Sequence, residues 1–411
     1  MSFVMGCTLA LAGCDNVEIL LWQTPEERAA SQSDDDPELE AQLDDEEDED
    51  DLPPVEPRTT AETDEQTETI SDPEQPFSDS IDETLVIEDV LILTMTDRGA
   101  ITGRVIIEEG IIKGVGDDIP LMPDESAVTV IDGNGYTLLP GLADMHTHYW
   151  QPEEGILFLA NGITTVRNMW GTEIAIRLDE GAKNGAFPGP QVFTPGPLMD
   201  GADPFWGERS LVVTSPQMAR GAVRAQKAAG FQAIKLHKKI DRQSFEAAVD
   251  EAKTQGLQVY THTPLSMNVR DVLAAGTDSL EHLDGVSAAL TNQDAKSTGG
   301  TLPISQWSDV SRSQMKPLAN AFAKSSVASV PTFTAINTRY QSMLDPDRFF
   351  EKPDAAYLTF AVKDWWLETA DTARGELRKQ EINSARANQL AFVKALHDAG
   401  AELLIGTDSP N

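Results

Sequence analysis

The chain has 411 residues, 40% of them hydrophobic, which is enough for at least one large folded core. Its net charge of −37 and its lack of a basic stripe exclude nucleic acid as a partner, because nucleic-acid binding depends on lysine and arginine at the phosphates. Much of the charge is local, since residues 34–83 hold 23 acidic residues and one basic residue, Arg58.

The two cysteines, Cys7 and Cys14, both lie near the N-terminus, so the rest of the chain carries neither disulfides nor a thiolate nucleophile. A short apolar run leads into LAGC at residues 11–14, which resembles the lipobox of bacterial lipoproteins. The resemblance implies a signal peptide at residues 1–13 and lipidation of Cys14, although no lysine or arginine precedes the run as in an ordinary leader. Because the run is too short to span a bilayer, we expect membrane attachment through a lipid anchor only, on the periplasmic side of the bacterial cell envelope.

Residues 14–83 are acidic, polar and interrupted by proline, as in the stretch DDEEDEDDLPPVEP. So few apolar side chains cannot offset the conformational entropy that is lost when a backbone becomes ordered. Like charges also repel one another along the chain and keep it extended. The sequence therefore predicts a disordered acidic linker.

Strand-like patterns begin at Thr84. Three runs, LVIEDVLILT, RVIIEEGIIKGVG and AVTVIDGNGYTLLP, are rich in β-branched residues, and Gly110 marks a turn inside the second. These runs predict a small antiparallel β-subdomain, of which residues 84–138 form the N-terminal part.

Strand-like and helical patterns alternate after Pro140. Eight strands are predicted, namely the run that ends at His148 and the runs TTVRNM, QVFTPG, QAIKLH, LQVYTH, DSLEHL, SVASVPTF and ELLIGTD. Helices are predicted between several of them, for example over residues 216–229 and 241–255, each with a capping residue or an early proline at its start. Eight β/α units over residues 139–411 predict the α/β class and a (β/α)8 barrel of the TIM type.

Two of the six histidines, His146 and His148, lie two residues apart at the end of the first predicted barrel strand. Side chains two apart in a strand point to the same face, so these two imidazoles project together. Four more polar side chains end other predicted strands: Lys235, His262, His282 and Asp408. Because the carboxyl ends of barrel strands form one face, we expect all six side chains to converge on a divalent metal site.

The motifs LLPGLADMHTH, NGITTVRNMWG, GPQVFTPGPLMDG, FQAIKLH, LQVYTHTPL, GTDSLEHLDG and LLIGTDSPN carry a resemblance that covers residues 84–411. With them the chain resembles the amidohydrolase superfamily, in particular the metal-dependent group that includes imidazolonepropionase-like proteins and prolidase-like dipeptidases. The ordered set of His-x-His, Lys, His, His and Asp is specific for the superfamily. It is shared, however, by hydrolases that act on very different bonds.

The resemblance implies two metal ions, expected to be Zn²⁺. His146, His148 and Asp408 would hold one ion, and His262 and His282 would hold the other. Lys235 would bridge them as an N-carboxylated lysine, because a free ammonium cannot ligate a cation whereas a carbamate supplies two oxygens. Such ions acidify a shared water, and Asp408 is expected to take its proton and pass it to the leaving amine.

The function implied is hydrolysis of a C–N bond in a small molecule that is an amide, a peptide or a cyclic amide. A deaminase or cyclic-amide hydrolase with one metal ion is the alternative, and such a site would not use Lys235. A tethered binding protein and an inactive fragment are two further alternatives. The oligomeric state stays open.

Other residues are expected near this site. His237 shares the inward face of Lys235, and Tyr260 and Arg339 lie where substrate groups could be contacted. Trp170 and Trp206 are expected on loops at the mouth of the barrel, where they could line an apolar subsite. Since the sequence stops soon after the eighth predicted strand, we also expect the last barrel helix and the closing strands of the β-subdomain to lie beyond residue 411.

Overall fold

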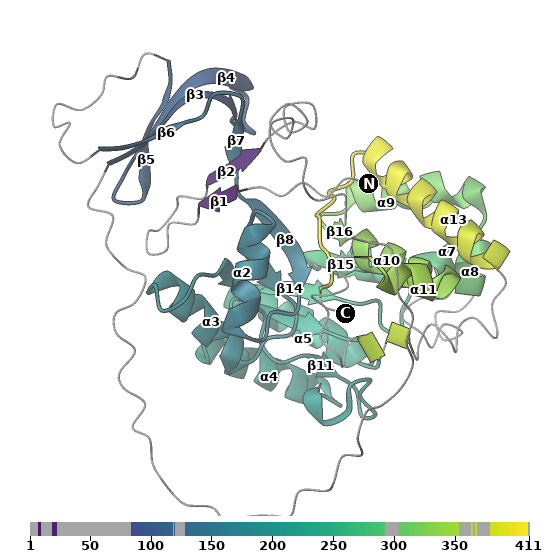
Figure 1. Cartoon of the computed structure of the whole chain (residues 1–411). Coiled ribbons are helices and arrows are strands. Elements are labelled where there is room, and N and C mark those ends of the chain that lie inside the picture. Colours follow the sequence, from purple (N-terminus) through teal and green to yellow (C-terminus); the bar gives the residue numbers. More distant parts are fainter. Residues whose placement is uncertain are drawn as a thin grey trace, which may run out of the picture. The chain divides into compact units, whose positions relative to one another are not determined.

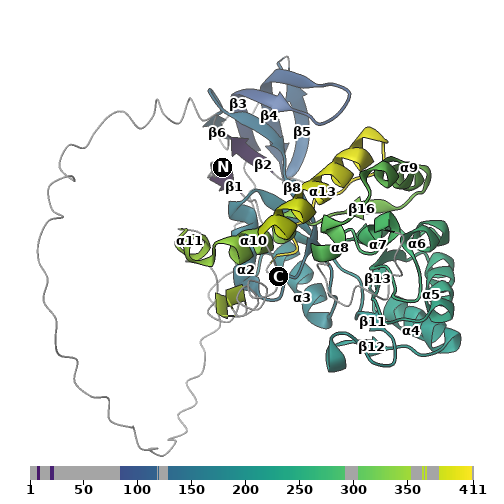
Figure 2. The ribbon, with the colours of Figure 1, turned by 90° about the vertical axis from the view of Figure 1, so that its right-hand side faces the viewer.

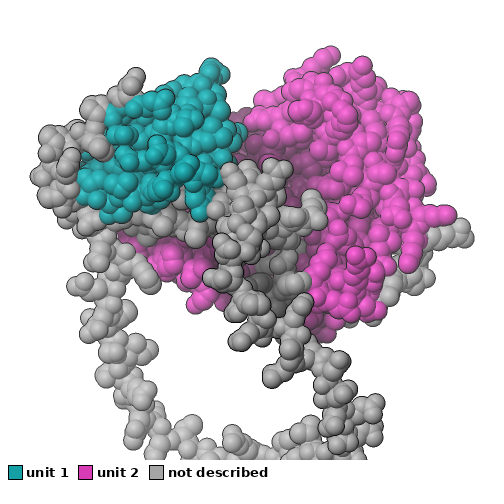
Figure 3. Space-filling view, turned by 45° about the horizontal axis from the view of Figure 1, so that its top comes forward, with its two compact units in different colours: residues 1–140 teal, residues 141–411 magenta. Residues whose placement is uncertain are grey.

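Figures 1 and 2 show the computed structural model of the chain from two sides. It describes residues 7–9, 19–22, 84–117, 119, 128–291, 304–352, 363–364, 366–367 and 379–409. Cys14 lies outside the described residues, as do most residues of the predicted leader and linker, so these features stay predictions. Within the described ranges no helix could span a membrane. The chain divides into two compact units, Met1–Pro140 and Gly141–Asn411, which Figure 3 colours separately.

The first unit is built on one sheet. Its main strands are β3 (Thr84–Leu93), β4 (Ala100–Glu108), β5 (Ile111–Gly116), β6 (Val128–Asp132) and β7 (Thr137–Pro140). As predicted, β4 pairs antiparallel with both β3 and β5. Side chains that alternate along β3 and β4, among them Leu85, Ile87, Val105 and Ile107, form the buried apolar core of this sheet.

The prediction of a fully antiparallel sheet is wrong for β6 and β7, which both run parallel to β3. β6 pairs with Thr84–Glu88 and β7 pairs with Leu91–Ile92, so the two strands follow one another along the same edge of β3. Asp89, with a φ of 53°, lies between the two pairings. β5 ends at Gly116 and β6 begins only at Val128, so the two strands are not joined by the tight turn of a hairpin.

Two short strands extend this sheet where the sequence predicts none. β1 (Cys7–Leu9) pairs antiparallel with β2 (Ile19–Trp22), and β2 pairs antiparallel with β7. The strand order is therefore β1-β2-β7-β3-β4-β5, with β6 beside β3.

The second unit is an α/β structure with two parallel sheets, in the orders β10-β9-β8 and β12-β11-β13-β14-β15-β16. The strands are β8 (Leu142–Thr147), β9 (Ile163–Asn168), β10 (Gln191–Phe193), β11 (Met199–Asp200), β12 (Leu211–Val212), β13 (Ala233–Leu236), β14 (Gln258–Thr261), β15 (Ser279–Glu281) and β16 (Ala328–Val330). Each of the first seven predicted barrel runs therefore contains a strand, which confirms those predictions.

The eighth predicted strand, ELLIGTD, forms isolated bridges instead of a regular ladder. Leu403 bridges Ser329 of β16, and Ser409 bridges Thr147 of β8, both in the parallel sense. Asp408, with a φ of 61°, takes the backbone out of the extended conformation between these bridges. The segment thus touches one strand of each parallel sheet without continuing either sheet.

Helices follow most of these strands. Their bounds are α2 (Pro152–Ala160), α3 (Glu173–Lys183), η2 (Gly207–Arg209), α4 (Pro216–Ala228), α5 (Arg242–Gln255), α6 (Val269–Ala275), α7 (Val286–Thr291), α8 (Ile304–Ser308), η4 (Arg312–Gln314), α9 (Met315–Lys324), α10 (Phe333–Leu344), α11 (Pro346–Phe350) and α13 (Lys379–Asp398). α4 and α5 start where predicted, because the side chains of Ser215 and Asp241 accept hydrogen bonds from backbone N–H groups of the first turn. These two helices lie side by side (Figures 1 and 2).

The largest apolar core lies between the six-stranded sheet and its helices. Ile234 in β13, Val259 in β14 and Leu280 in β15 are fully buried there and belong to one cluster with Phe245 of α5. Burying a side chain of this size contributes roughly 1.5–3 kcal/mol. Since side chains alternate along a strand, this packing directs Lys235 to the opposite face of β13.

Candidate active site

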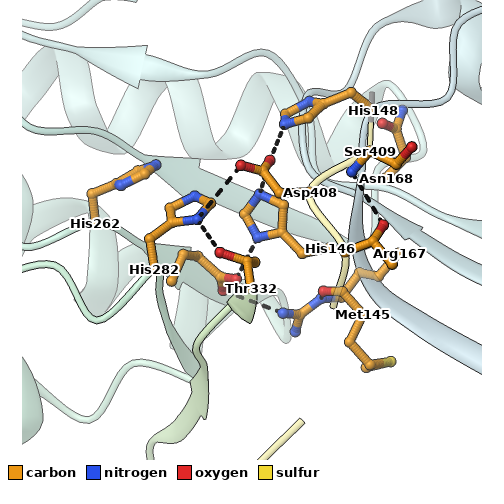
Figure 4. Close-up of polar contacts among 12 residues, drawn as sticks. Met145, His146, His148, Arg167, Asn168, His262, His282, Thr332, Asp408 and Ser409 are labelled. Carbon is orange, nitrogen blue, oxygen red and sulfur yellow. Dashed lines mark hydrogen bonds and ion pairs between the residues drawn. The ribbon is translucent and has the colours of Figure 1, made fainter. Parts of the chain in front are cut away.

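The ends of the parallel strands bring three of the predicted ligands close together, as Figure 4 shows. His146 lies near the end of β8, His282 directly follows β15, and Asp408 belongs to the segment that borders β8. One ligand atom from each of these residues lies within 4.8 Å of the others. Two imidazoles and a carboxylate at this spacing could hold a divalent metal ion.

His146 is oriented by a buried carboxylate. Its Nδ1 donates to Glu281 Oε2 over 2.6 Å, which leaves Nε2 at 3.3 Å from Asp408 Oδ1. Burial opposes protonation, but the charges of Asp408 and Glu281 outweigh it and raise the pKa of His146. A lone pair on Nε2 would repel the carboxylate of Asp408, so this geometry favours a positive charge between them, from a proton or from a metal ion.

His148 approaches the same carboxylate oxygen from its own strand end. Its Nε2 lies 3.0 Å from Asp408 Oδ1, while its buried Nδ1 has no hydrogen-bond partner among the described residues. Burial lowers the pKa of His148, so the neutral imidazole predominates. One oxygen of Asp408 therefore faces two imidazoles, as Figure 4 shows.

His282 is held by Thr332. Its Nδ1 lies 2.7 Å from Thr332 Oγ1 and 3.7 Å from Asp408 Oδ2. Among the described residues, seven non-glycine residues have a positive φ, and three of them are His282 at 58°, Thr332 at 46° and Asp408 at 61°. Such backbone conformations cost about 1–3 kcal/mol each and cluster at functional sites. This local strain sets the site apart from the regular strands around it.

His262 lies beside this trio. Its Nδ1 donates to Asp284 in a short hydrogen bond, and Asp284 also accepts from Lys238 Nζ over 3.1 Å. Burial, followed by the charge of Lys235, holds the pKa of His262 well below its usual value. The ring of His262 stacks on that of His282 with the centroids 4.9 Å apart. A neutral imidazole anchored through Nδ1 has its lone pair on Nε2, the form that binds metals.

Lys235 places a lysine side chain in the buried part of the site. It is 1% exposed, and its Nζ has no hydrogen-bond partner among the described residues. Burial lowers its pKa to about 8. A buried, unpartnered amine is costly, so its position calls for a chemical explanation.

Glu281 is a buried carboxylate that contacts both His146 and Arg167. Burial disfavours its charge, but Arg167 and Lys235 outweigh this and hold the pKa of Glu281 far below its usual range. Arg167 Nη2 lies 3.2 Å from Glu281 Oε1, and its guanidinium lies over the Tyr260 ring at 4.2 Å. The Tyr260 hydroxyl donates to Gln258. Tyr260, a predicted substrate contact, thus makes internal contacts and is 4% exposed.

The remaining predicted substrate contacts are His237 and Arg339. His237 directly follows β13, and its Nδ1 lies 3.1 Å from Asp200 Oδ2. Burial lowers the pKa of His237 in spite of this carboxylate. Arg339 lies on α10, where burial lowers its pKa and the nearby charge of Asp408 raises it in part. The ring of His237 lies 4.5 Å from that of the predicted ligand His262, and Arg339 is near enough to Asp408 for its charge to affect the pKa.

Five residues that the sequence does not predict orient these ligands. They are Asp144, Asp200, Glu281, Asp284 and Thr332, each hydrogen-bonded to a site residue or to its backbone. One signal was present, because the charged residues Glu281 and Asp284 lie close to His282 in the strand-like run SLEHLDG. A charged side chain inside a buried strand requires a partner, and a neighbouring ligand is such a partner.

Comparisons with known proteins identify the family of this chain. The model of the Amidohydrolase family matches residues 137–411, more than half of the chain. Among solved structures, a bottromycin amidohydrolase superposes with a TM-score of 0.62 at 21% identity, covering 80% of this chain and 69% of that one. A putative prolidase from Bifidobacterium longum gives a TM-score of 0.53 at 20% identity, covering 80% of this chain and 74% of that one. At these identities the two structures show the fold alone.

Curated relatives are similar over a short stretch only. A 5'-deoxyadenosine deaminase of Methanobrevibacter smithii is 44% identical over 68 residues, which is 16% of this chain and 15% of the relative. A protein of the same name from Methanosarcina acetivorans is 41% identical over 66 residues, 16% of this chain and 14% of the relative. The match therefore spans less than a sixth of either relative.

Proposed function

Because the chain belongs to the amidohydrolase family, we propose that it is a metal-dependent hydrolase of a C–N bond in a small peptide, amide or cyclic amide. The observation that carries this proposal is the juxtaposition of His146, His282 and Asp408 within 4.8 Å. The buried amine of Lys235, whose Nζ has no hydrogen-bond partner in the described part of the chain, accompanies this trio.

The donor set fits divalent metal ions. His146 and His262 each give their Nδ1 hydrogen to a carboxylate, which leaves Nε2 free to bind a cation. We propose that His146, His148 and Asp408 hold one Zn²⁺ and that His262 and His282 hold a second. His282 lies within reach of both groups, since its Nδ1 is 3.7 Å from Asp408 Oδ2. When bound, such ions would acidify a water and polarise a carbonyl group.

Lys235 would supply the bridge between the two ions. The ammonium group of Lys235 loses its proton more readily than that of an ordinary lysine, because burial lowers its pKa to about 8. A neutral Nζ can attack the carbon of carbon dioxide; an N–C bond forms, one proton leaves, and a carbamate with two oxygens results. Those oxygens are ligands that a protonated ammonium cannot offer. The carbamate would thereby give the buried Nζ of Lys235 a bonding partner.

Asp408 is the residue that we expect to move protons. Its carboxylate is ionised, because His282 and His146 hold its pKa well below the usual range in spite of burial. It would accept a proton from the attacking water as the new C–O bond forms. It would then return that proton to the nitrogen as the C–N bond breaks, which yields a carboxylic acid and an amine.

A closed eight-stranded barrel is part of this proposal. The bridges from Leu403 to Ser329 and from Ser409 to Thr147 support it on one side. The bridge from Pro195 to Ala233 supports it on the other side, where the chain runs on from β10 toward β13. Closure would direct the carboxyl ends of all strands to one face. We further propose that Cys14 carries a lipid that anchors the enzyme to the membrane on its periplasmic side.

A deaminase with one metal ion is the second candidate. The local similarity to 5'-deoxyadenosine deaminases favours it, although that similarity covers only 16% of this chain. A one-metal site leaves Lys235 without a role. Its buried and unpartnered amine therefore favours the bridged, two-metal hydrolase.

The test is a substrate screen with metal analysis. Purified protein is assayed with dipeptides, N-acyl amino acids, cyclic amides and 5'-deoxyadenosine, before and after chelation and after addition of Zn²⁺. We expect zinc-dependent release of an amine from an amide, and Asp408→Asn should lower its rate by about 10² or more. Release of ammonia from 5'-deoxyadenosine would establish the deaminase instead. Full activity after complete removal of metal would refute both.

A further inference from the structure

We propose that four aromatic side chains select a substrate that carries a bulky, planar apolar group beside the C–N bond to be cleaved. They are Trp150, Trp170, Phe205 and Trp206, here called the apolar arc. This inference rests on the proposed hydrolase function and adds the class of substrate. The experiment distinguishes a failure of the aromatic preference from a failure of the hydrolase proposal.

Five of the six histidines form one continuous chain of ring contacts, here called the imidazole arc. It runs from His148 to His146, with centroids 5.5 Å apart, and from His146 to His282 at 4.4 Å. It continues to His262 at 4.9 Å and from there to His237 at 4.5 Å. Every predicted imidazole ligand belongs to this arc.

The apolar arc joins the two ends of the imidazole arc. Trp150 stacks on His148 with a centroid distance of 6.2 Å, and Trp170 contacts the His148 ring at 6.3 Å. The contacts then pass from Trp170 to Trp206 at 5.3 Å and from Trp206 to Phe205 at 5.4 Å. Phe205 finally contacts the ring of His237 at 5.4 Å.

The two arcs therefore form one closed ring of contacts, in which the imidazole arc is the polar part and the apolar arc is the apolar part. Among the described residues, the ring contacts between the two arcs are at His148 and at His237, the two ends of the imidazole arc. A molecule whose scissile bond faces His146 and Asp408 would thus have the apolar arc as its other boundary. Offset and edge-on contacts with indole rings favour flat, apolar groups.

The exposed end of the apolar arc is available to such a group. Trp206 is 41% exposed and Phe205 is 38% exposed, whereas Trp170 is only 9% exposed. Neighbouring aromatic rings that stay partly exposed are common where a protein recognises a ligand. The buried Trp170 would support the exposed pair from behind.

Asp200 fixes the apolar arc relative to the imidazoles. It is fully buried, and its Oδ2 accepts from His237 Nδ1 at 3.1 Å and from the backbone N–H of Phe205 at 2.8 Å. Its Oδ1 accepts from the backbone N–H groups of Gly201 and Lys239. One carboxylate thereby sets the orientation of His237 and the position of the loop that carries Phe205. The loop is consequently a constrained element of the site.

Matched substrate pairs test the proposal. We would measure kcat/KM for N-acetyl-L-tryptophan against N-acetyl-L-alanine, and for glycyl-L-tryptophan against glycyl-L-alanine, with the zinc-loaded full chain. Isothermal titration calorimetry would measure the binding of the same compounds. The variants are Trp206→Ala, Trp206→Phe and Phe205→Ala. Phe193→Ala is the control, since Phe193 is 41% exposed and makes no ring contact with either arc.

We expect the tryptophan member of a pair to be favoured by about tenfold or more in the unchanged protein. Trp206→Ala and Phe205→Ala should remove most of that preference, Trp206→Phe should keep much of it, and Phe193→Ala should leave it unchanged. Equal values for both members, or a preference that survives in Trp206→Ala, would overturn the inference. If neither pair is cleaved, these compounds are not substrates and the hydrolase proposal fails for them. The preference for the tryptophan compound, measured by calorimetry in the same variants, then tests the inference by itself.

Discussion

Glu281 and His146 form a buried hydrogen bond of 2.6 Å across 135 residues of sequence. Glu281 accepts from Nδ1, so the Nε2 atom of His146 is the one that faces Asp408. A carboxylate behind a metal-binding histidine fixes both the tautomer and the direction of the ring. The orientation of the site therefore depends on a residue that would not touch the substrate.

Glu281→Gln should weaken metal binding. A carboxamide is a poorer acceptor for His146 and leaves Arg167 without its charged partner, so the Zn²⁺ affinity should fall by about 10–100-fold. Equilibrium dialysis against zinc measures this, and circular dichroism checks the fold. Glu246→Gln is the control, because the Glu246 side chain is 55% exposed on α5. An affinity equal to that of the control would show that Glu281 does not orient the site.

The sequence predicts seven strands of the second unit correctly, because strand patterns follow local rules, whereas the assignment of the ligands stays a prediction. Buried parallel strands appear as short apolar runs, and a polar residue that ends such a run stands out, as Lys235 and His262 do. The parallel pairing of β6 and β7 with β3 departs from the predicted antiparallel subdomain, since neighbours in a sheet depend on connections and not on strand patterns. ELLIGTD forms isolated bridges in place of a regular strand, and the residue type of Asp408 at its end does not reveal the positive φ found there.

The layer behind the ligands could not be predicted residue by residue. Asp144 accepts from the backbone N–H of His146 and from Thr407, which is 263 residues away. A contact of this kind depends on how the strands meet around the site. The contact between the two arcs could not be predicted for the same reason, because Phe205 and His237 become neighbours only when β11 and β13 pair.

Gly406→Ala should damage the site without removing a ligand. A Cβ at position 406 would lie 2.7 Å from His146 Cβ and 3.0 Å from the His146 backbone nitrogen, so β8 would have to shift. We expect reduced zinc affinity and a loss of about 1–3 kcal/mol in the free energy of unfolding. Denaturant unfolding and dialysis measure the two effects.

Gly221→Ala is the matched control for that change. A Cβ at Gly221 meets nothing within 4 Å, and the residue lies inside α4. This variant should gain about 0.5–1 kcal/mol in the free energy of unfolding and keep its zinc affinity. If both glycine variants behaved alike, the crowding at His146 would not explain the result.

Cys14→Ser tests the proposed lipid anchor. The hydroxyl cannot receive the thioether-linked lipid, so in a bacterial host the protein should move from the membrane fraction to the soluble fraction. Cys7→Ser should leave the distribution unchanged, because Cys7 lies in the proposed signal peptide. Mass spectrometry that finds Cys14 unmodified in membrane-bound material would contradict the anchor.

The metal content of Lys235→Ala tests the central proposal most directly, with Lys239→Met as the control because Lys239 makes its ion pair with the exposed Asp203. The bridged site predicts about two zinc ions per chain in the unchanged protein and in the control, and about one or fewer in Lys235→Ala. It also predicts a carbamate signal in ¹³C NMR after incubation with labelled bicarbonate, which should be absent in Lys235→Ala. One zinc ion in all three proteins, with no carbamate signal in any of them, would contradict the account.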